Sequence, residues 1–437
     1  MVKVMRCETI VISFVVLLVL SSTSIDSVRG DPDNNFVPSD YTPSDPFYIY
    51  SDSQLASLGF QGDGSQDTPY LIENLLFDLN ETYGSGRAIS IWNTRSYITI
   101  QNCYIQGKNE IWEAGTPQEW VWVGGLGVEL VNVSNVRVEN CTFYIFGEGI
   151  TLANCTQVVL HKNTFRNEQF SEETEGSPIK VQDNSTQVTV SENLMYKCGT
   201  GITIAQSYRT LISKNKVIEC NAGLESFHFS KLNTISENLF LSNRYEGIVI
   251  GRSNDTLVTK NNCSYNGLAG IFLDEISLNV TILLNVFAFN GVRLNATLNI
   301  TTATPASEDI GFGVWVQNGS SGNNITMNDL IDNNMNAKND VDGNIYDKNY
   351  YSDYVGVDAD NDLFGDTPYN IMGDAPTYDN NPRMNRLDFE APTTPTMGTD
   401  TTSTATDWPE NDLLLLSVGM ISGFVIICVI VIVMKKR

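Results

Sequence analysis

Residues 201–269 read GITIAQSYRTLISKNKVIECNA, GLESFHFSKLNTISENLFLSNRYE and GIVIGRSNDTLVTKNNCSYNGLA, which are three versions of one repeat. The repeats begin at Gly201, Gly223 and Gly247, and the next begins at Gly270, so the steps are 22, 24 and 23 residues. Short runs in which apolar and polar residues alternate are separated by turn-forming residues, which is typical of strands and not of helices. A period of this length without room for a helix predicts a solenoid of stacked coils.

The pattern continues on both sides of these repeats. The first inward apolar residue marks nine coils, at Ile89, Val128, Ile150, Ile179, Ile202, Leu224, Ile248, Ile271 and Val314. The interval after Ile89 is long and contains Trp112, Trp120 and Trp122. Because insertions in a solenoid become loops on its flank, where ligands often bind, these tryptophans are candidate ligand-binding residues.

A second column recurs in the turns and is mostly asparagine. Its members are Cys103, Cys141, Asn163, Asn193, Asn215, Asn238, Asn261, Asn285 and Asn328. Side chains stacked about 4.8 Å apart can hydrogen-bond along the axis of the solenoid. We therefore expect a structural ladder that satisfies backbone groups at a buried turn.

A third column, four residues after each marker, consists mainly of turn formers. Three successive coils depart from this rule with His228, Arg252 and Glu275, and Asp274 lies beside the last. These four residues lie within two coil spacings and supply an imidazole, a guanidinium and two carboxylates. Such groups can bind an acidic sugar and catalyse a reaction on it, so the four are the candidate catalytic residues. An exposed ladder of ion pairs along a turn edge explains the same residues without a substrate.

An Asp-rich segment follows the coils. Asp358, Asp360, Asp362 and Asp366 present carboxylates that suit a hard cation, so calcium is a candidate cofactor. The segment is not an EF-hand, because Leu363 stands where the turn glycine would be and Tyr369 where the bidentate Glu would be. A plain Asp/Asn-rich turn is the alternative interpretation.

The cysteines also occupy columns. Cys198 and Cys220 are 22 residues apart in one column, and they form either a disulfide or a pair of buried free thiols. The two histidines, His161 and His228, belong to coils three steps apart and to different columns, so they do not predict a shared copper centre.

The two ends of the chain predict export and anchoring. Residues 1–30 have the pattern of a secretory signal peptide, and Leu413–Met434 is an apolar span of bilayer length followed by Lys435, Lys436 and Arg437. Positive residues after the span predict a single-pass type I protein of the cell membrane with an extracellular ectodomain. Sequons, of which Asn80, Asn295 and Asn299 are the preferred ones, fit a glycoprotein.

The net charge of −25 excludes nucleic acid as an expected partner, because phosphate binding needs clustered Lys and Arg. An acidic surface instead suits a salty medium or the binding of cations.

The chain resembles the right-handed parallel β-helix proteins of the pectate-lyase-like superfamily, and within them the family related to the periplasmic copper-processing protein NosD. The resemblance rests on GFQGDGSQDTPYLIENL (Gly59–Leu75), on the coils from Ile89 to Leu330, and on the closing NYYSDYVGVDADNDLFGDTPYNI and YDNNPRM. It implies the fold and, as one alternative, a copper-processing accessory role. The family usually has Gly-Asp-Gly where this chain has Asn361, Asp362 and Leu363.

We therefore expect an all-β protein: a single-stranded right-handed parallel β-helix of nine or more coils of 22–24 residues, followed by one C-terminal transmembrane helix. The expected organisation is a signal peptide (1–30), a lead-in and cap (31–85), the β-helix (86–345), an Asp-rich capping segment (346–390), a Thr/Pro-rich stalk (391–412), the membrane span (413–434) and a cytoplasmic tail (435–437).

We expect a cell-surface protein that binds polysaccharide or envelope glycans, or presents its flank to them, without catalysis. A carbohydrate-active lyase, hydrolase or epimerase using the edge at His228, Arg252 and Glu275 is the first alternative. A copper-processing accessory protein is the second, and a purely structural envelope protein remains open beside them.

Overall fold

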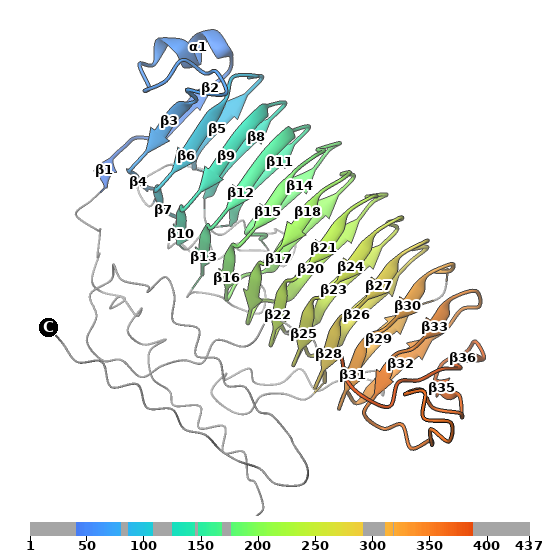
Figure 1. The fold of residues 1–437 in the computed structure, drawn as a ribbon. Helices are drawn as coiled ribbons and strands as arrows, with labels where there is room; N and C mark the ends of the chain where they lie inside the picture. Colours follow the sequence, from blue (N-terminus) through green and yellow to red (C-terminus); the bar gives the residue numbers. More distant parts are fainter. Residues whose placement is uncertain are drawn as a thin grey trace, which may run out of the picture. The chain divides into compact units, whose positions relative to one another are not determined.

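Each sequence repeat folds into one coil of three short strands, and corresponding strands of successive coils pair in parallel (Figure 1). The structure is a computed structural model that describes residues 41–79, 86–107, 125–144, 147–167, 176–291, 311–317 and 319–387. Within these residues the protein is a parallel β-helix built from three sheets, which we call A, B and C.

Sheet A has twelve strands: β1 (Thr42–Pro43), β4 (Leu75–Asp78), β7 (Tyr104–Gln106), β10 (Thr142–Tyr144), β13 (Thr164–Arg166), β16 (Leu194–Tyr196), β19 (Lys216–Ile218), β22 (Leu239–Leu241), β25 (Asn262–Ser264), β28 (Val286–Ala288), β31 (Asp329–Ile331) and β34 (Tyr350–Tyr351). Sheet B has eleven: β2 (Phe47–Ile49), β5 (Arg87–Trp92), β8 (Leu126–Val131), β11 (Glu148–Ala153), β14 (Ile179–Gln182), β17 (Thr200–Ala205), β20 (Ala222–Phe227), β23 (Glu246–Gly251), β26 (Ala269–Asp274), β29 (Phe312–Val316) and β32 (Met335–Asn339).

Sheet C has thirteen strands: β3 (Tyr70–Glu73), β6 (Ile98–Gln101), β9 (Ser134–Glu139), β12 (Thr156–His161), β15 (Thr189–Ser191), β18 (Leu211–Ser213), β21 (Thr234–Ser236), β24 (Leu257–Thr259), β27 (Thr281–Leu283), β30 (Asn324–Thr326), β33 (Ile345–Asp347), β36 (Thr377–Asp379) and β35 (Tyr369–Ile371). All the pairs are parallel except β35 with β36, which is antiparallel.

A coil runs from sheet B to sheet C to sheet A, so it turns at a B–C corner, a C–A corner and an A–B corner. The segments 80–85, 108–124, 145–146, 168–175 and 292–310, which lie outside the described residues, each fall between a strand of sheet A and the next strand of sheet B. The long intervals between successive coils therefore enter at the A–B corner, whereas residues 50–69 connect β2 to β3 at the B–C corner of the first coil.

The core is made by inward side chains in register. Ile202, Leu224 and Ile248 pair on consecutive strands of sheet B and are fully buried. In sheet A, Phe143 and Phe165 stack with their ring centroids 4.7 Å apart. Burying one such side chain stabilises the fold by about 1.5–3 kcal/mol, and the columns repeat this contribution coil after coil.

Buried asparagines stack at the C–A corner in the column that the sequence suggested. The backbone N–H of Asn193 donates to Oδ1 of Asn215 at 3.0 Å, and Nδ2 of Asn193 donates to the same oxygen at 2.9 Å and to the carbonyl of Leu160 at 3.0 Å. The same pattern links Asn163, Asn193, Asn215, Asn238, Asn261, Asn285 and Asn328. Each amide thus satisfies backbone groups that a turn would leave unpaired.

A second ladder, which the sequence analysis did not identify, lies at the A–B corner. Here Oδ1 of Asn243 accepts from the backbone N–H of Cys220 at 3.0 Å, and the column continues through Asn266, Asn290 and Asn333. Two of the three corners therefore hold asparagine ladders.

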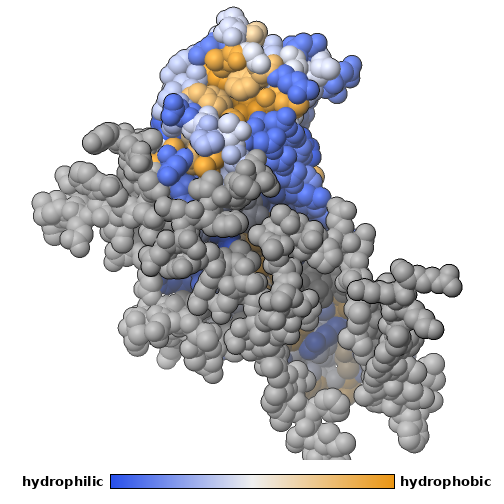
Figure 2. All heavy atoms as spheres, turned by 90° about the vertical axis from the view of Figure 1, so that its left-hand side faces the viewer, coloured by the Kyte–Doolittle hydropathy of each residue, from blue (hydrophilic) through white to orange (hydrophobic). Residues whose placement is uncertain are grey.

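The N-terminal end of the coils is covered by α1 (Asp52–Ser57). Ser51 caps this helix by accepting from the backbone N–H of Gln54 at 3.2 Å, and Leu55 is buried beneath it. Figure 2 shows hydrophobic residues gathered beside hydrophilic ones at this end of the flank that it views.

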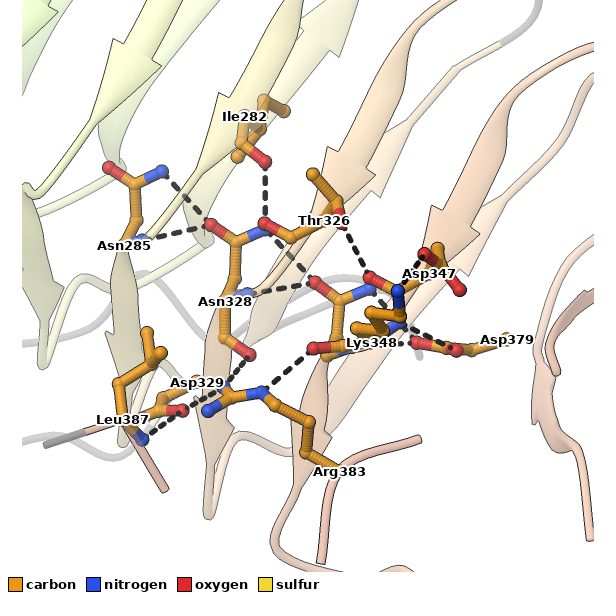
Figure 3. Close-up of polar contacts among 11 residues, drawn as sticks. Ile282, Asn285, Thr326, Asn328, Asp329, Asp347, Lys348, Asp379, Arg383 and Leu387 are labelled. Atoms are coloured by element: carbon orange, nitrogen blue, oxygen red, sulfur yellow. Dashed lines mark hydrogen bonds and ion pairs between the residues drawn. The ribbon is translucent and has the colours of Figure 1, made fainter. Parts of the chain in front are cut away.

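The C-terminal end is closed by the segment that follows β34 (Figure 3). Asp379 takes the next position of the asparagine ladder, where its Oδ2 accepts from N and Nδ2 of Asn349 at 2.9 and 3.0 Å. Arg383 forms a buried ion pair with Asp329, Nη2 to Oδ1 at 2.6 Å, and its Nε donates to the carbonyl of Lys348 at 2.8 Å. The YDNNPRM motif is therefore a capping element.

The β-helix extends beyond the nine expected coils at both ends. Phe47 pairs with Ile89, and Ala337 pairs with Val314, so strands β2 and β32 continue the column of sheet B. The first coil lies within residues 31–85, which the sequence suggested as lead-in and cap. The last coil begins within the expected β-helix of residues 86–345, but no marker was assigned to it, because its inward positions include Asn339, which breaks the apolar pattern.

No helix among the described residues is long and apolar enough to cross a membrane. The expected signal peptide, stalk and span at 413–434 lie outside the described residues.

Candidate functional site

The candidate catalytic residues lie at the B–C corner in left-handed turn positions. The backbone φ angles are 54° at His228, 49° at Arg252 and 28° at Glu275. Nε of Arg252 forms an ion pair with Oε2 of Glu275, and both side chains are about half exposed. The His228 side chain is exposed, and its ring centroid lies 6.1 Å from that of Phe227. The structure thus joins Arg252 and Glu275 in an exposed ion pair, which is the simpler of the two interpretations of this column.

Asp274 connects this corner to the outer face of sheet B. Ile271 and Leu273 are fully buried, so the alternation of the strand places Phe272 and Asp274 on the outer face. Oδ1 of Asp274 accepts from the backbone N–H of Glu275 at 2.9 Å. Burial raises the pKa of Asp274.

Two glutamates lie beside Asp274 on the same face. Glu225 is on β20, and Glu246 begins β23, the strand between β20 and β26. Burial raises the pKa of Glu225. Burial, and then the charge of Glu225, raises the pKa of Glu246 to about 7. We call Glu225, Glu246 and Asp274 the acidic patch.

Aromatic rings border the acidic patch on the C-terminal side. Phe272 stacks on Trp315 with their centroids 4.4 Å apart, and Phe312 lies 4.9 Å from Trp315. Nζ of Lys338 lies 5.0 Å from the centroid of the Trp315 ring, and Nε1 of Trp315 donates to Oδ2 of Asp340 at 3.1 Å. The tryptophan is therefore held in one orientation with its ring on the outer face.

Phe227 borders the patch from the other side. A Cβ atom added at Gly251 would lie 3.0 Å from a ring carbon of Phe227 and 3.8 Å from Cβ of Asp274. Glycine at this position therefore gives the Phe227 ring room to lie across the neighbouring strand, next to Asp274.

A second aromatic group occupies the N-terminal end of the same face. The rings of Tyr50 and Trp92 meet edge to face at 5.8 Å, and Tyr48 lies 6.5 Å from Tyr50. Between this group and Trp315 the face spans about eight to nine strand spacings of about 4.8 Å, or roughly 40 Å.

The expected ligand-binding tryptophans Trp112, Trp120 and Trp122 lie outside the described residues. The chain leaves the described residues at Gly107 and returns at Gly125, at the A–B corner. That corner borders sheet B on the edge opposite to the B–C corner.

The structure brings three of the four candidate calcium ligands together. Ligand oxygens of Asp358, Asp360 and Asp362 all lie within 4.8 Å of one another. Asp366 instead accepts from the backbone N–H of Ala359 at 2.6 Å through Oδ2. Leu363 adopts a φ of 76°, so the chain makes the left-handed turn without glycine.

The cysteines of the described coils are free thiols. The backbone N–H of Cys198 donates to Sγ of Cys220 at 3.4 Å, and both residues are buried. The disulfide alternative is therefore wrong in this structure, because the two side chains point the same way from successive coils. Burial raises the pKa of Cys198 well above its usual range, so this thiol is a poor nucleophile and metal ligand.

No copper ligand set lies among the described residues. Nδ1 of His161 bonds Oγ of Ser191 at 3.0 Å on sheet C, whereas His228 lies at the B–C corner. The one group of His, Cys, Asp or Glu residues in the described ranges with mutually close ligand atoms is the Asp358 cluster, whose carboxylates suit hard cations.

Comparisons with known proteins agree with this architecture. The model of the right-handed β-helix region matches residues 58–217, so the protein is a right-handed parallel β-helix over these coils. The model of the periplasmic copper-binding protein NosD matches residues 183–356.

Solved structures with a similar fold are distant in sequence. The A-module of a mannuronan C-5 epimerase of Azotobacter vinelandii has 12% identity and a TM-score of 0.48, covering 70% of this chain and 79% of that one. A surface adhesin of Streptococcus pneumoniae has 13% identity and a TM-score of 0.42, covering 72% and 84%. A periplasmic alginate epimerase has 15% identity and a TM-score of 0.40, covering 70% and 83%. No curated protein matches the chain in sequence.

Sequence reasoning identified Asp274 but missed Glu225 and Glu246. Both glutamates lie in the repeats that define the fold, Glu225 two residues after a repeat glycine and Glu246 directly before one. Alternation along the repeats places Glu225 at an outward position, whereas Glu246 shares the parity of the buried Ile248 and Ile250, so its place near Glu225 follows only from the three-dimensional structure.

Proposed function

We propose that the protein binds an extended polysaccharide along the outer face of sheet B, at the cell surface and without turning it over. The observation that supports this most directly is the arrangement of aromatic rings at both ends of that face with carboxylates between them. Aromatic rings pack against the apolar faces of sugar rings, and carboxylates accept hydrogen bonds from hydroxyl groups.

The rigidity of the face supports the same proposal. Its outer side chains stand on eleven strands in a parallel register, fixed from within by the apolar core and by the ladders at two corners. A surface that is organised before binding loses little conformational entropy when a long ligand settles on it. Export and anchoring, which rest on the sequence of the two ends, would present this face outside the cell.

The test is retention of the full-length chain on a panel of immobilised neutral, acidic and basic polysaccharides, with new reducing or unsaturated ends measured in the same samples. Tyr50→Ala and Trp315→Ala should each weaken binding several-fold, because each removes one ring from the face. Tyr378→Ala, an exposed tyrosine on β36, is the matched control. Failure of every polysaccharide to retain the protein would overturn the proposal.

A carbohydrate-active enzyme is a second candidate function. The observation in its favour is that Glu246, whose pKa lies near 7, and Glu225 share one face, because a general acid works best with a pKa near the working pH. New chain ends that disappear in Glu246→Gln would favour the enzyme, and retention without turnover would eliminate it. The copper-processing alternative has no ligand set among the described residues to support it.

A further inference from the structure

Ion pairs neutralise carboxylates toward both ends of the outer face of sheet B. Glu129 pairs with Arg87 at 3.4 Å, and Glu148 pairs with Lys180 at 3.2 Å. At the C-terminal end, Lys338 pairs with Asp340 at 3.6 Å. On these strands an anionic side chain therefore has its cation within the protein.

The acidic patch departs from this arrangement. Within the described ranges, no ion pair joins Glu225, Glu246 or Asp274 to a Lys, Arg or His. Arg252 pairs with Glu275, and its charge also acts on Asp274, while Glu225 accepts a hydrogen bond from the Thr200 side chain. Glu246 is largely buried, and the one hydrogen bond to its carboxylate comes from its own backbone N–H. Three successive strands thus carry carboxylates outside any ion pair, and Glu246 is the member with neither a cation nor a donor from another residue beside it.

A mostly buried carboxylate without a partner is costly, because it has lost water without gaining a charge or donor in exchange. Burial also raises the pKa of all three members of the patch, and the charges of Glu225 and Asp274 raise that of Glu246 further. The group that is missing from this site is therefore a positively charged hydrogen-bond donor.

The surroundings of the patch select among cations. A divalent ion needs six or more oxygen ligands at about 2.3–2.6 Å, and in the described part of the chain the close set of oxygens is at Asp358 and not here. The rings of Phe227 and Phe272 instead form apolar borders on either side of the patch. Carboxylates between aromatic rings suit a cation carried on an apolar body, since the rings also attract cations.

We propose that the acidic patch binds protonated amino groups of an amino-sugar polysaccharide. This inference rests on the proposed function, because it names the class of polysaccharide that the outer face of sheet B would take. Uronic-acid polymers would be repelled by the patch, and fully N-acetylated polymers would lack the charge.

The experiment measures binding of the full-length chain to a glucosamine oligosaccharide, to its N-acetylated counterpart and to an oligogalacturonate of equal length. The glucosamine oligosaccharide should bind at least about tenfold more tightly than the N-acetylated one, and the oligogalacturonate most weakly. Glu225→Gln and Glu246→Gln should each remove most of this preference. Glu237→Gln, which removes an exposed carboxylate paired with Lys214 off this face, should keep it.

A second readout is the proton balance of binding. An ammonium group beside Glu246 favours its ionised form, so binding near pH 6 should release protons. Calorimetry in two buffers of different ionisation enthalpy detects this release, which should shrink in Glu246→Gln.

The outcomes separate the two proposals. Equal binding of the amino and N-acetylated oligosaccharides would overturn this inference and leave polysaccharide binding standing, whereas no binding of any glycan would overturn both. If both Gln variants still prefer the glucosamine oligosaccharide, the preference arises from the overall net charge of −25 and not from the acidic patch, and the proposed site is wrong. Polylysine that binds as tightly and with the same dependence on Glu246 would assign the patch to a basic protein instead.

Discussion

At the scale of single residues, Glu246 differs most from its surroundings. It is the first residue of β23, and it is largely buried near Glu225 and Asp274. Its charge therefore opposes folding, whereas most surface carboxylates in a protein are close to neutral in their effect.

The pH dependence of the free energy of unfolding should show that the charge of Glu246 opposes folding. The pKa of Glu246 rises from 4.5 to about 7 on folding. The unfolded chain therefore loses this proton at lower pH than the folded protein does, and the free energy of unfolding should fall as pH rises from about 4.5 to 7. The loss due to Glu246 is on the order of 3 kcal/mol. Urea unfolding followed by circular dichroism at several pH values measures it.

Glu246→Gln should flatten the curve in this window and gain stability relative to the unaltered protein at pH 7.5. Glu237→Gln, which removes an exposed carboxylate, is the control and should leave the curve unchanged. Parallel curves for the Glu246→Gln variant and the unaltered protein would contradict the burial of this charge.

Asn238 lies in the middle of the asparagine ladder. Its Oδ1 accepts from N and Nδ2 of Asn215 at 2.9 and 3.0 Å, and its Nδ2 donates to the carbonyl of Ile212 at 3.0 Å. Asn238→Ala leaves these buried groups unpaired and should cost about 3 kcal/mol in chemical denaturation. Asn370→Ala, at an exposed position on β35, should cost less than about 0.5 kcal/mol. Equal costs would show that the ladder does not stabilise the coils.

The sequence predicted the ladder because its asparagines recur once per coil, and it predicted the turn column because left-handed positions favour Asn and Asp. It did not predict Glu246, because the burial of this side chain near Glu225 depends on the residues of adjacent strands. The ion pair between Arg252 and Glu275 follows from their places in successive coils.

At the scale of elements, the Asp-rich segment after β34 is held as a loop by its own carboxylates. Asp358 accepts from the backbone N–H groups of Asp362 and Leu363, each at 3.0 Å. The negative charge of Asp362 is the main reason that the pKa of Asp360 is raised. The loop is thus ordered in spite of repulsion between its side chains.

Calcium, the candidate cofactor that the sequence suggested for this segment, should relieve this repulsion. Adding it should raise the melting temperature of the full-length chain by a few degrees, and chelation should reverse the change. Asp358→Asn and Asp360→Asn should abolish the response, whereas Asp342→Asn, an exposed aspartate of another turn, should retain it. If neither calcium nor chelator changes the melting temperature, this loop does not bind calcium.

At the scale of the whole molecule, the two ends of the β-helix are closed by different means. The N-terminal end has a short helix, and the C-terminal end has an antiparallel strand pair locked by Asp379 and Arg383. Both cover strand edges that would otherwise be free to pair with another chain.

Opening the C-terminal end should therefore cause self-association. The double variant Asp379→Ala/Arg383→Ala leaves Asp329 buried without its cation, which alone costs about 3–5 kcal/mol, and it loosens the cover over β32, β33 and β34. Size-exclusion chromatography with light scattering should show oligomers that Tyr378→Ala, a change on the outside of β36, does not produce. A stable monomer would contradict a protective role for the cap.

The regular coils could be predicted almost entirely from the sequence, because period, alternation and turn residues agree from Ile89 to Val314. The terminal coils could not, because they lack that agreement: the coil at Ala337 has Asn339 pointing inward, where Thr377 accepts from its Nδ2 at 2.7 Å. Their fit depends on capping residues far along the chain.

The A–B corner has a consequence for how such a protein can change. The segments 168–175 and 292–310 both enter there, while the ladder at the C–A corner keeps its register from Asn163 to Asn349, on both sides of each segment. Lengthening a coil at the A–B corner need not displace the strands that follow it. The β-helix therefore behaves as a scaffold in which one edge can acquire, lose or exchange peptide segments while the recognition face beside it keeps its geometry.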